Sequence, residues 1–137
     1  MTTPGDVFCY YGFDFGDGTV RDKLFIILND YTQDGSSICL VLMTTSKWKR
    51  YRGALTGCNP DKAVFVIPKG KECFNEDTYV VMKVRPFPFG EFIKEGIAGI
   101  TKPIGSISHR CLSDLLACLK KFKEDIAPEH WRILFPR

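Results

Sequence analysis

Histidine is scarce in this chain of 137 residues, which contains only His109 and His130. The two lie far apart, and neither stands at metal-ligand spacing from a cysteine. No Gly-x-Ser-x-Gly segment is present to expose a nucleophilic serine. These absences argue against a zinc site and against a Ser-His-Asp hydrolase, and we expect neither a metal nor another cofactor.

Long apolar runs are also absent, since none approaches the roughly 18 residues that a membrane-spanning helix requires. The first residues show no signal-peptide pattern. The six cysteines include no Cys-x-x-Cys pair, and several lie inside apolar segments, as buried free thiols do. We therefore expect a cytoplasmic protein that does not enter a membrane and keeps its cysteines reduced. An even number of cysteines is the signature of the rival interpretation, a disulfide framework.

Neither sign of charge dominates, with 19 lysines and arginines against 16 acids and a net charge of +3. That excess is too small to indicate nucleic-acid binding by itself, so local clustering of cations must carry such a case. Hydrophobic residues at 45% and charged residues at 26% are typical of a globular protein. At this length the chain can bury one core, and we predict a single domain over residues 1–137.

Five segments have the apolar, β-branched and aromatic composition of strands, with turn residues between them. The second and third are so continuously apolar that both faces must be buried, which favours the middle of a small barrel. The predicted strands are residues 4–11, 21–28, 38–43, 63–68 and 78–84, with a further short strand or turn over 97–104. The glycine-rich segment 12–18 is predicted to be a mobile flap.

One amphipathic helix is predicted over residues 109–123, with Ser106 or Ser108 as its N-terminal cap. Its apolar residues recur at the three- and four-residue spacing of one buried face. Residues 127–137 are too apolar for a loose tail, and we expect them to dock on the barrel or on a partner subunit. Two prolines in segment 85–90 argue against a central strand. We predict a loop there, whose phenylalanines either cap the core or form a recognition surface.

Cations and aromatics crowd into residues 47–52, a segment with four cations, two aromatics and no acid. Such a composition suits a segment that grips single-stranded nucleic acid by phosphate attraction and base stacking, although a solvated surface hairpin looks similar. Three hydroxyl residues precede it, directly after a buried strand, where they can donate hydrogen bonds to phosphate oxygens. The candidate residues are Thr44, Thr45, Ser46, Lys47, Trp48, Lys49, Arg50 and Arg52.

The order and spacing of several short motifs resemble the MazF/PemK toxin endoribonucleases, the toxin halves of bacterial toxin–antitoxin pairs. Residues 4–8 are similar to that family's opening Gly-Asp-hydrophobic strand, and Lys23 stands where the family usually has the arginine of an Arg-Pro pair. Residues 43–47 resemble its hydroxyl-bearing segment after the third strand. Residues 104–107 resemble its lead into the carboxy-terminal helix. The resemblance covers most of the chain.

This resemblance implies a mainly β fold with a C-terminal helix, built as a small SH3-like barrel of the MazF/PemK/CcdB type. It also implies a homodimer whose interface groove binds single-stranded RNA, an antitoxin protein as partner, and metal-independent cleavage in which the neighbouring 2′-hydroxyl attacks phosphorus. Carried over by position, Thr44 takes the catalytic hydroxyl role and Lys23 takes the place of the family's catalytic arginine. Thr45 and Ser46 become auxiliary phosphate contacts, and Lys47 helps to hold the RNA backbone.

Lysine at position 23 departs from the family pattern. A guanidinium offers two parallel donors to a phosphate, whereas an ammonium is a point charge on a flexible stem. Arg21 has the side-chain parity to share a strand face with Lys23 and is a candidate substitute, while Asp22 is expected to point away. The alternative function is a catalytically inactive or CcdB-like barrel that acts by binding a protein or a nucleic acid.

Overall fold

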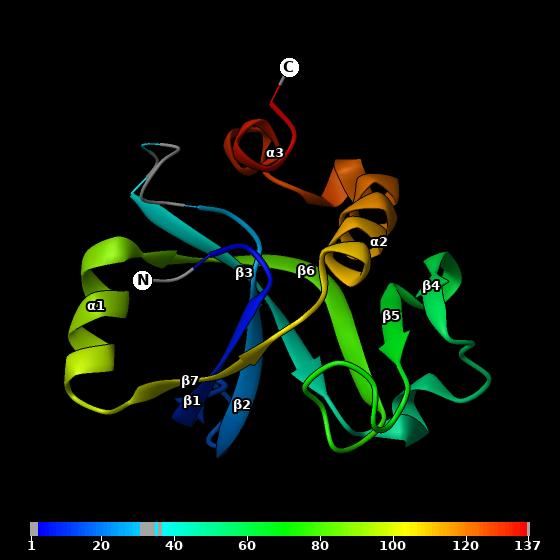
Figure 1. The fold of residues 1–137 in the computed structure, drawn as a ribbon, viewed down its shortest axis with the longest axis horizontal. Helices are drawn as coiled ribbons and strands as arrows, with labels where there is room; N and C mark the ends of the chain where they lie inside the picture. The colour runs from blue at the N-terminus through cyan, green and yellow to red at the C-terminus, as the bar shows by residue number, and fades with distance from the viewer. Residues whose placement is uncertain (1–2, 31–34, 36, 137) are drawn as a thin grey trace.

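A computed structural model describes residues 3–30, 35 and 37–136 of the chain (Figure 1). Within these residues seven strands form one antiparallel sheet: β1 (Asp6–Asp14), β2 (Val20–Ile27), β3 (Ile38–Thr45), β4 (Gly57–Asn59), β5 (Val64–Ile67), β6 (Thr78–Pro88) and β7 (Thr101–Ser106). The helices are α1 (Phe89–Ile97), α2 (His109–Leu119) and α3 (Pro128–Leu134), with the 3-10 helices η1 (Trp48–Tyr51), η2 (Pro60–Lys62) and η3 (Lys120–Asp125).

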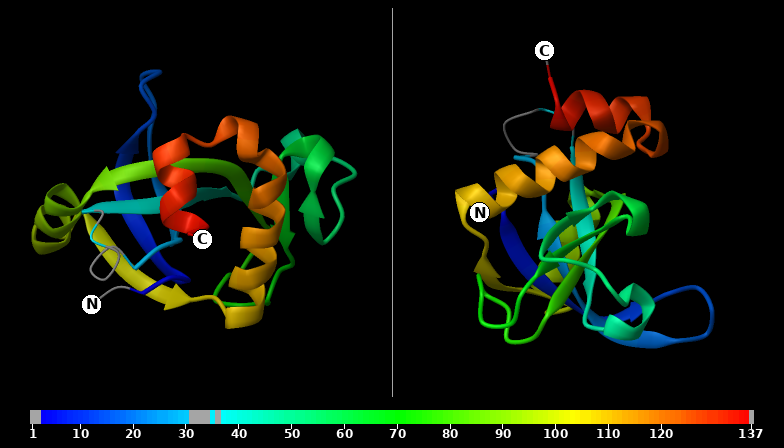
Figure 2. Two further views of the ribbon diagram at one scale, coloured as in Figure 1. Left: turned by 90° about the horizontal axis from the view of Figure 1, so that it is seen from above. Right: turned by 90° about the vertical axis from the view of Figure 1, so that its right-hand side faces the viewer.

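The strands are hydrogen-bonded in the order β4-β5-β6-β3-β2-β1-β7. The described strands β4 and β7 therefore form the two ends of an open sheet. Figure 2 shows α2 and α3 together on one side of the sheet, with α1 set apart from them at the far end of β6. The expectation of a mainly β fold with a C-terminal helix is confirmed. No helix in the described part of the chain is long and apolar enough to cross a bilayer.

Both faces of the central strands are buried, as their continuous apolar runs predicted. Successive side chains of a strand point to opposite faces, so neighbouring residues enter different clusters. Ile26 packs with Leu115 of α2 in the larger cluster, on the face that α2 covers. Phe25 packs with Phe92 of α1 in a second cluster on the other face. The candidate site lies next to this second, aromatic cluster.

The five predicted strands correspond to β1, β2, β3, β5 and β6, with small shifts of their ends. Two short strands, β4 and β7, extend the sheet at its edges; β7 overlaps the predicted strand or turn over 97–104. Helix α1 was not predicted at all. Its N-terminus has no capping side chain, and it packs against β3, β6 and β7.

The predicted loop over residues 85–90 is wrong for its first part, because β6 continues to Pro88 and pairs with the start of β3. On its other side β6 pairs with β5 only as far along the strand as Val81. Residues 85–88 therefore have one neighbouring strand, and prolines are tolerated in such an edge segment.

Phe87, in the same edge segment, caps the aromatic cluster. Its ring centroid lies 5.6 Å from that of Phe25 and 6.0 Å from that of Tyr10. This contact agrees with the core-capping interpretation of the segment rather than with a recognition surface. The side chain of Phe89 lies outside the described part of the chain.

Helix α2 is shorter than the helix predicted over residues 109–123. Ser108 is its cap, with its hydroxyl accepting a hydrogen bond from the Cys111 backbone N–H at 3.1 Å. The regular helix ends at Leu119, and Phe122 has a non-helical backbone inside η3. The turn lets residues 128–134 fold back as α3, whose Trp131 packs against the larger cluster. Ile133, Leu134 and Phe135 pack against the same cluster.

The expectation that all cysteines are free is wrong for one pair. Cys58 of β4 and Cys118 of α2 form a disulfide, with Cα atoms 5.6 Å apart and a sequence separation of 60 residues. The two belong to elements that meet only in the folded chain, so cysteine spacing carried no sign of the bond. Cys9, Cys39, Cys73 and Cys111 are not disulfide-bonded.

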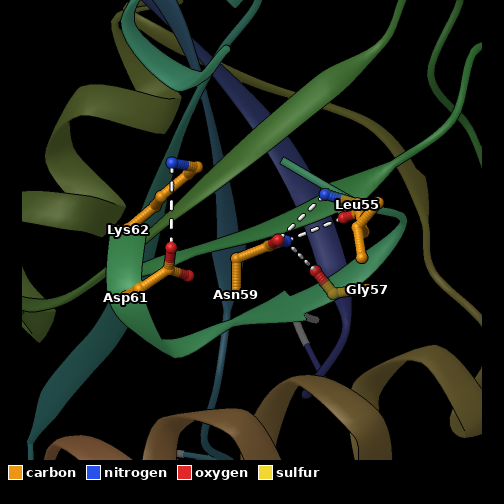
Figure 3. Close-up of polar contacts among 5 residues, drawn as sticks. All are labelled: Leu55, Gly57, Asn59, Asp61 and Lys62. Atoms are coloured by element: carbon orange, nitrogen blue, oxygen red, sulfur yellow. Dashed lines mark hydrogen bonds and ion pairs between the residues drawn. The ribbon is translucent and has the colours of Figure 1, made fainter. Parts of the chain in front are cut away.

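A buried asparagine shapes the loop that brings Cys58 to α2 (Figure 3). The Asn59 side-chain oxygen accepts a hydrogen bond from the Leu55 N–H at 2.9 Å. Its amide donates to the carbonyl oxygens of Leu55, at 2.7 Å, and of Gly57, at 2.9 Å. These bonds replace the strand pairing that residues 53–56 lack and fix the entry to β4.

Candidate functional site

Four cations line one cleft of about 230 Å³, which we call the cation cleft. Arg21 and Lys23 come from β2, Lys47 follows β3, and Arg50 belongs to η1. The other lining residues are Phe15, Asp17, Thr19, Met43, Thr45, Tyr51 and Val81. Cations far apart in the sequence thus converge on one face of the sheet, with one acid among the lining residues.

The strand register explains why Lys23 and Thr45 share this cleft. β2 and β3 are antiparallel, with Phe25 opposite Met43. Two residues further along each strand, Lys23 and Thr45 have the same side-chain parity as Phe25 and Met43 and so share their face of the sheet. Asp22 does not line the cation cleft, and its carboxylate accepts a hydrogen bond from the Gly12 N–H at 2.9 Å.

Lys23 stands in an unfavourable electrostatic environment. Its half-buried position lowers the pKa of the ammonium below the ordinary 10.5, and the positive charges of Lys47, Arg21 and Arg50 lower it further. Its Nζ lies 5.6 Å from the centroid of the Phe15 ring, a weak compensation. No described carboxylate forms an ion pair with it. An anion in the cleft would relieve this repulsion.

Thr44 is placed differently from Thr45. Its side chain is 4% exposed, and its hydroxyl donates a hydrogen bond to the Leu24 carbonyl oxygen at 3.0 Å. Thr44 does not line the cation cleft; it lines an adjoining cleft of about 500 Å³, which we call the polar cleft. Ser46 also lines the polar cleft, and Thr45 lines both. The Thr44 hydroxyl therefore links β3 to β2, whereas Thr45 lines the cation cleft and its hydroxyl oxygen accepts a hydrogen bond from the Lys47 backbone N–H at 3.2 Å.

The remaining predicted residues form the outer rim of the cation cleft. Trp48 and Lys49 line a shallow depression together with Lys47 and Arg50. Lys47 and Arg50 also line the cation cleft. The Arg52 guanidinium carbon lies 5.3 Å from the centroid of the Trp48 ring. Because the Trp48 side chain is 52% exposed, the rim presents an aromatic face beside the cations.

Sequence reasoning missed the contribution of the predicted flap and of Tyr51. Phe15, Asp17 and Thr19 belong to the hairpin between β1 and β2, and all three line the cation cleft. Hydrogen bonds from Thr19 lower the pKa of Asp17, so the one acid of the cleft is held by its own loop. The sequence did offer a signal for these residues: a short connection between β1 and β2 must lie near Arg21, at the start of β2.

Two comparisons with known proteins bear on this chain. No model of a known protein family matches it, and no curated protein is similar enough to be counted as a relative. The function of the site therefore rests on the geometry of its own residues.

Proposed function

We propose that this protein is the toxin of a toxin–antitoxin pair, a metal-independent endoribonuclease that binds single-stranded RNA at the cation cleft. The observation that carries the proposal is the convergence of Arg21, Lys23, Lys47 and Arg50 on one cleft beside the Thr45 hydroxyl. Like charges held this close repel one another, and an anionic phosphodiester converts the repulsion into attraction. The pKa of Lys23 is lowered first by burial and then by this repulsion.

Aromatic residues support a single strand as the ligand rather than a duplex or a free phosphate. Phe15 and Tyr51 line the cation cleft, and the Trp48 ring is exposed at its rim. Tyr51 is held by stacking on Tyr79, with ring centroids 5.4 Å apart. The bases of a single strand can stack on such rings, whereas the bases of a duplex are already covered by their neighbours.

The proposed chemistry uses the RNA's own nucleophile. The 2′-oxygen forms a bond to phosphorus while the bond from phosphorus to the 5′-oxygen breaks; the 2′-hydroxyl proton leaves to solvent, and the 5′-oxygen takes up a proton. Arg21 and Lys23 would neutralise the charge that develops on the phosphoryl oxygens. Thr45 would donate a hydrogen bond to one of them. Thr44 is assigned a positioning role, because its hydroxyl already bonds the Leu24 carbonyl.

The proposal extends to scaffold and assembly. We assign the bent sheet crossed by α2 to the SH3-like barrels of the MazF/PemK type, and we propose a homodimer whose groove accepts RNA or an antitoxin segment that folds on binding. Ile93 and Ile97 of α1, with side chains 44% and 84% exposed, support a partner surface at that end of the sheet. Exposed isoleucines one helical turn apart are characteristic of residues that a partner covers.

The test is to incubate the purified protein with a long unstructured RNA in EDTA. We expect fragments that end in 2′,3′-cyclic phosphate and begin with 5′-hydroxyl groups, as the 2′-oxygen mechanism requires. Thr45→Val should slow cleavage by about a hundredfold, the typical effect of losing one donor to a developing anion. Its matched control, Thr44→Val, should cleave at nearly the parent rate and lose about 1 kcal/mol of stability with its hydrogen bond. RNA that stays intact would contradict the proposed endoribonuclease activity.

Salt-dependent RNA binding without cleavage would support the second candidate, an inactive barrel that acts by binding. The specific observation in its favour is the C-terminal surface, where Trp131 and Phe135 lie with ring centroids 4.4 Å apart. Lys123 contacts the Trp131 ring at 5.2 Å, and these residues line a hollow of about 590 Å³. Such a surface suits a protein partner rather than a catalytic role.

RNA binding is expected to weaken at a lower pH than it would if Lys23 had the pKa of an ordinary lysine. Only protonated Lys23 attracts phosphate, and its pKa in the free protein lies below 10.5. Bound phosphate raises that pKa, so affinity is full at lower pH and falls as pH rises through the lowered value. Fluorescence anisotropy with an adenosine RNA carrying 2′-O-methyl riboses measures the decline at constant ionic strength. Lys23→Arg should remove it, and an unchanged decline would exclude Lys23 as its source.

A further inference from the structure

The polar cleft adjoins the cation cleft and shares two residues with it. Lys23 and Thr45 line both. At about 500 Å³ the polar cleft falls within the range of small-molecule sites, roughly 300–1,000 Å³, and is large enough for a nucleobase. If a phosphate occupies the cation cleft, as the proposed function requires, the base of a neighbouring nucleotide is within reach of the polar cleft.

The polar cleft has the opposite electrostatic character. Its charged lining residues are Asp22, Glu76 and the shared Lys23. Two carboxylates against one cation disfavour a second phosphate in this cleft. A neutral group that carries hydrogen-bond donors fits better, because a carboxylate is acceptor-only when ionised.

Two hydroxyls of the polar cleft, those of Thr44 and Thr78, already donate hydrogen bonds within the protein. Thr44 donates to the Leu24 carbonyl oxygen at 3.0 Å, and Thr78 donates to the Glu76 carbonyl oxygen at 2.9 Å. Both side chains are buried, at 4% and 6% exposure, so these bonds are internal to the protein. Within the described part of the chain no residue donates a hydrogen bond to the Glu76 carboxylate. The Glu76 carboxylate is therefore open to hydrogen-bond donors from a ligand.

The walls of the polar cleft suit a flat ring. Leu24, Phe74 and Ile104 contribute apolar side chains to the lining, and Ile104 is 42% exposed. Asn75, next to Glu76, adds an amide that can both donate and accept. A slot with apolar walls and a carboxylate is a suitable receptor for the edge of an unpaired base.

We propose that the polar cleft is a base-recognition pocket that selects a base with an exocyclic amino group, guanine first. This inference rests on the proposed RNA binding at the cation cleft. Guanine presents two adjacent donors, N1–H and the N2 amino group, which one carboxylate can accept together. Uracil presents a single N–H between two carbonyl oxygens, and those oxygens would face the carboxylate and be repelled.

The experiment compares two short labelled RNAs by fluorescence anisotropy with the full chain. One contains only uridine and the other has a single central guanosine; both carry 2′-O-methyl riboses, which prevent attack by the 2′-oxygen. We expect the guanosine RNA to bind about tenfold more tightly, the usual value of a good bidentate base contact. Glu76→Gln should bring the ratio close to one without weakening the uridine RNA. Glu124→Gln, an exposed change on η3, is the matched control and should leave the ratio unchanged.

The outcomes separate this inference from the function on which it rests. Salt-dependent binding of the uridine RNA with no gain from guanosine would overturn the base pocket and leave RNA binding intact. A guanosine gain that survives both Glu76→Gln and Asp22→Asn would also overturn it. Failure of the uridine RNA to bind at low salt would overturn the proposed function together with the pocket. Replacement of guanosine by inosine, which lacks the N2 amino group, should remove part of the gain.

Discussion

Lys23→Met is expected to slow RNA cleavage by about a hundredfold or more without loss of stability. Methionine has nearly the same length and removes only the charge. The loss follows from the proposed role of Lys23 as a preorganised cation at the scissile phosphate, an effect worth roughly 3–4 kcal/mol in comparable sites. The stability should be unchanged or higher, because a half-buried ammonium close to Arg21, Lys47 and Arg50 costs free energy in the unliganded protein.

Two measurements on the same sample test this expectation: the initial rate of cleavage of a fluorescent RNA and the midpoint of thermal unfolding. Lys49→Met is the matched control, because Lys49 is exposed and lies outside the cation cleft. It should retain most of the activity and lose only part of the salt-dependent affinity. Equal rates for Lys23→Met and the parent would exclude Lys23 from the site.

Reduction of the Cys58–Cys118 disulfide is expected to cost about 4 kcal/mol of stability. The bond closes a long loop, with a sequence separation of 60 residues, and the chain-entropy model gives this magnitude for such a loop. For a domain of this size the midpoint of thermal unfolding should fall on the order of 10 °C. β4 should be the first element to lose its structure, because it has only three residues and pairs with β5 alone.

Thermal unfolding with and without a reductant measures the effect. The double variant Cys58→Ser with Cys118→Ser should resemble the reduced parent and show no further response to reductant, which controls for the other cysteines. Thiol titration of the unfolded, unreduced protein should count only Cys9, Cys39, Cys73 and Cys111. An unfolding midpoint that does not respond to reductant would show that the bond contributes no stability.

Local patterns predicted the parts of the fold that local physics determines. The continuous apolar runs of β2 and β3 reported burial on both faces, and the parity of Arg21 and Lys23 placed both in one cleft. The α2 cap followed from Ser108 in the same way. Helix α1 escaped although Phe92, Ile93 and Ile97 recur at helical spacing, because it has no capping side chain and directly follows a proline-containing segment.

The candidate site depended on register as well as on sequence. Position in the motif favoured Thr44, but Thr45 lines the cation cleft, whereas the Thr44 hydroxyl donates a hydrogen bond to the Leu24 carbonyl oxygen. A shift of one residue in register exchanges the two faces, and no residue near position 44 announces which pairing forms. The disulfide escaped for a related reason, since its partners meet only when α2 packs beside β4.

The sharing of Lys23 and Thr45 between the two clefts limits how such a protein could evolve. With the functions proposed for the two clefts, a substitution at either position would alter catalysis and sequence preference together, so selection for a new cleavage sequence would meet a loss of rate. Residues 73–76 line only the polar cleft and belong to the connection between β5 and β6. Connections of this kind tolerate change better than strands do. New specificities are therefore expected to arise there, with the cation cleft kept constant.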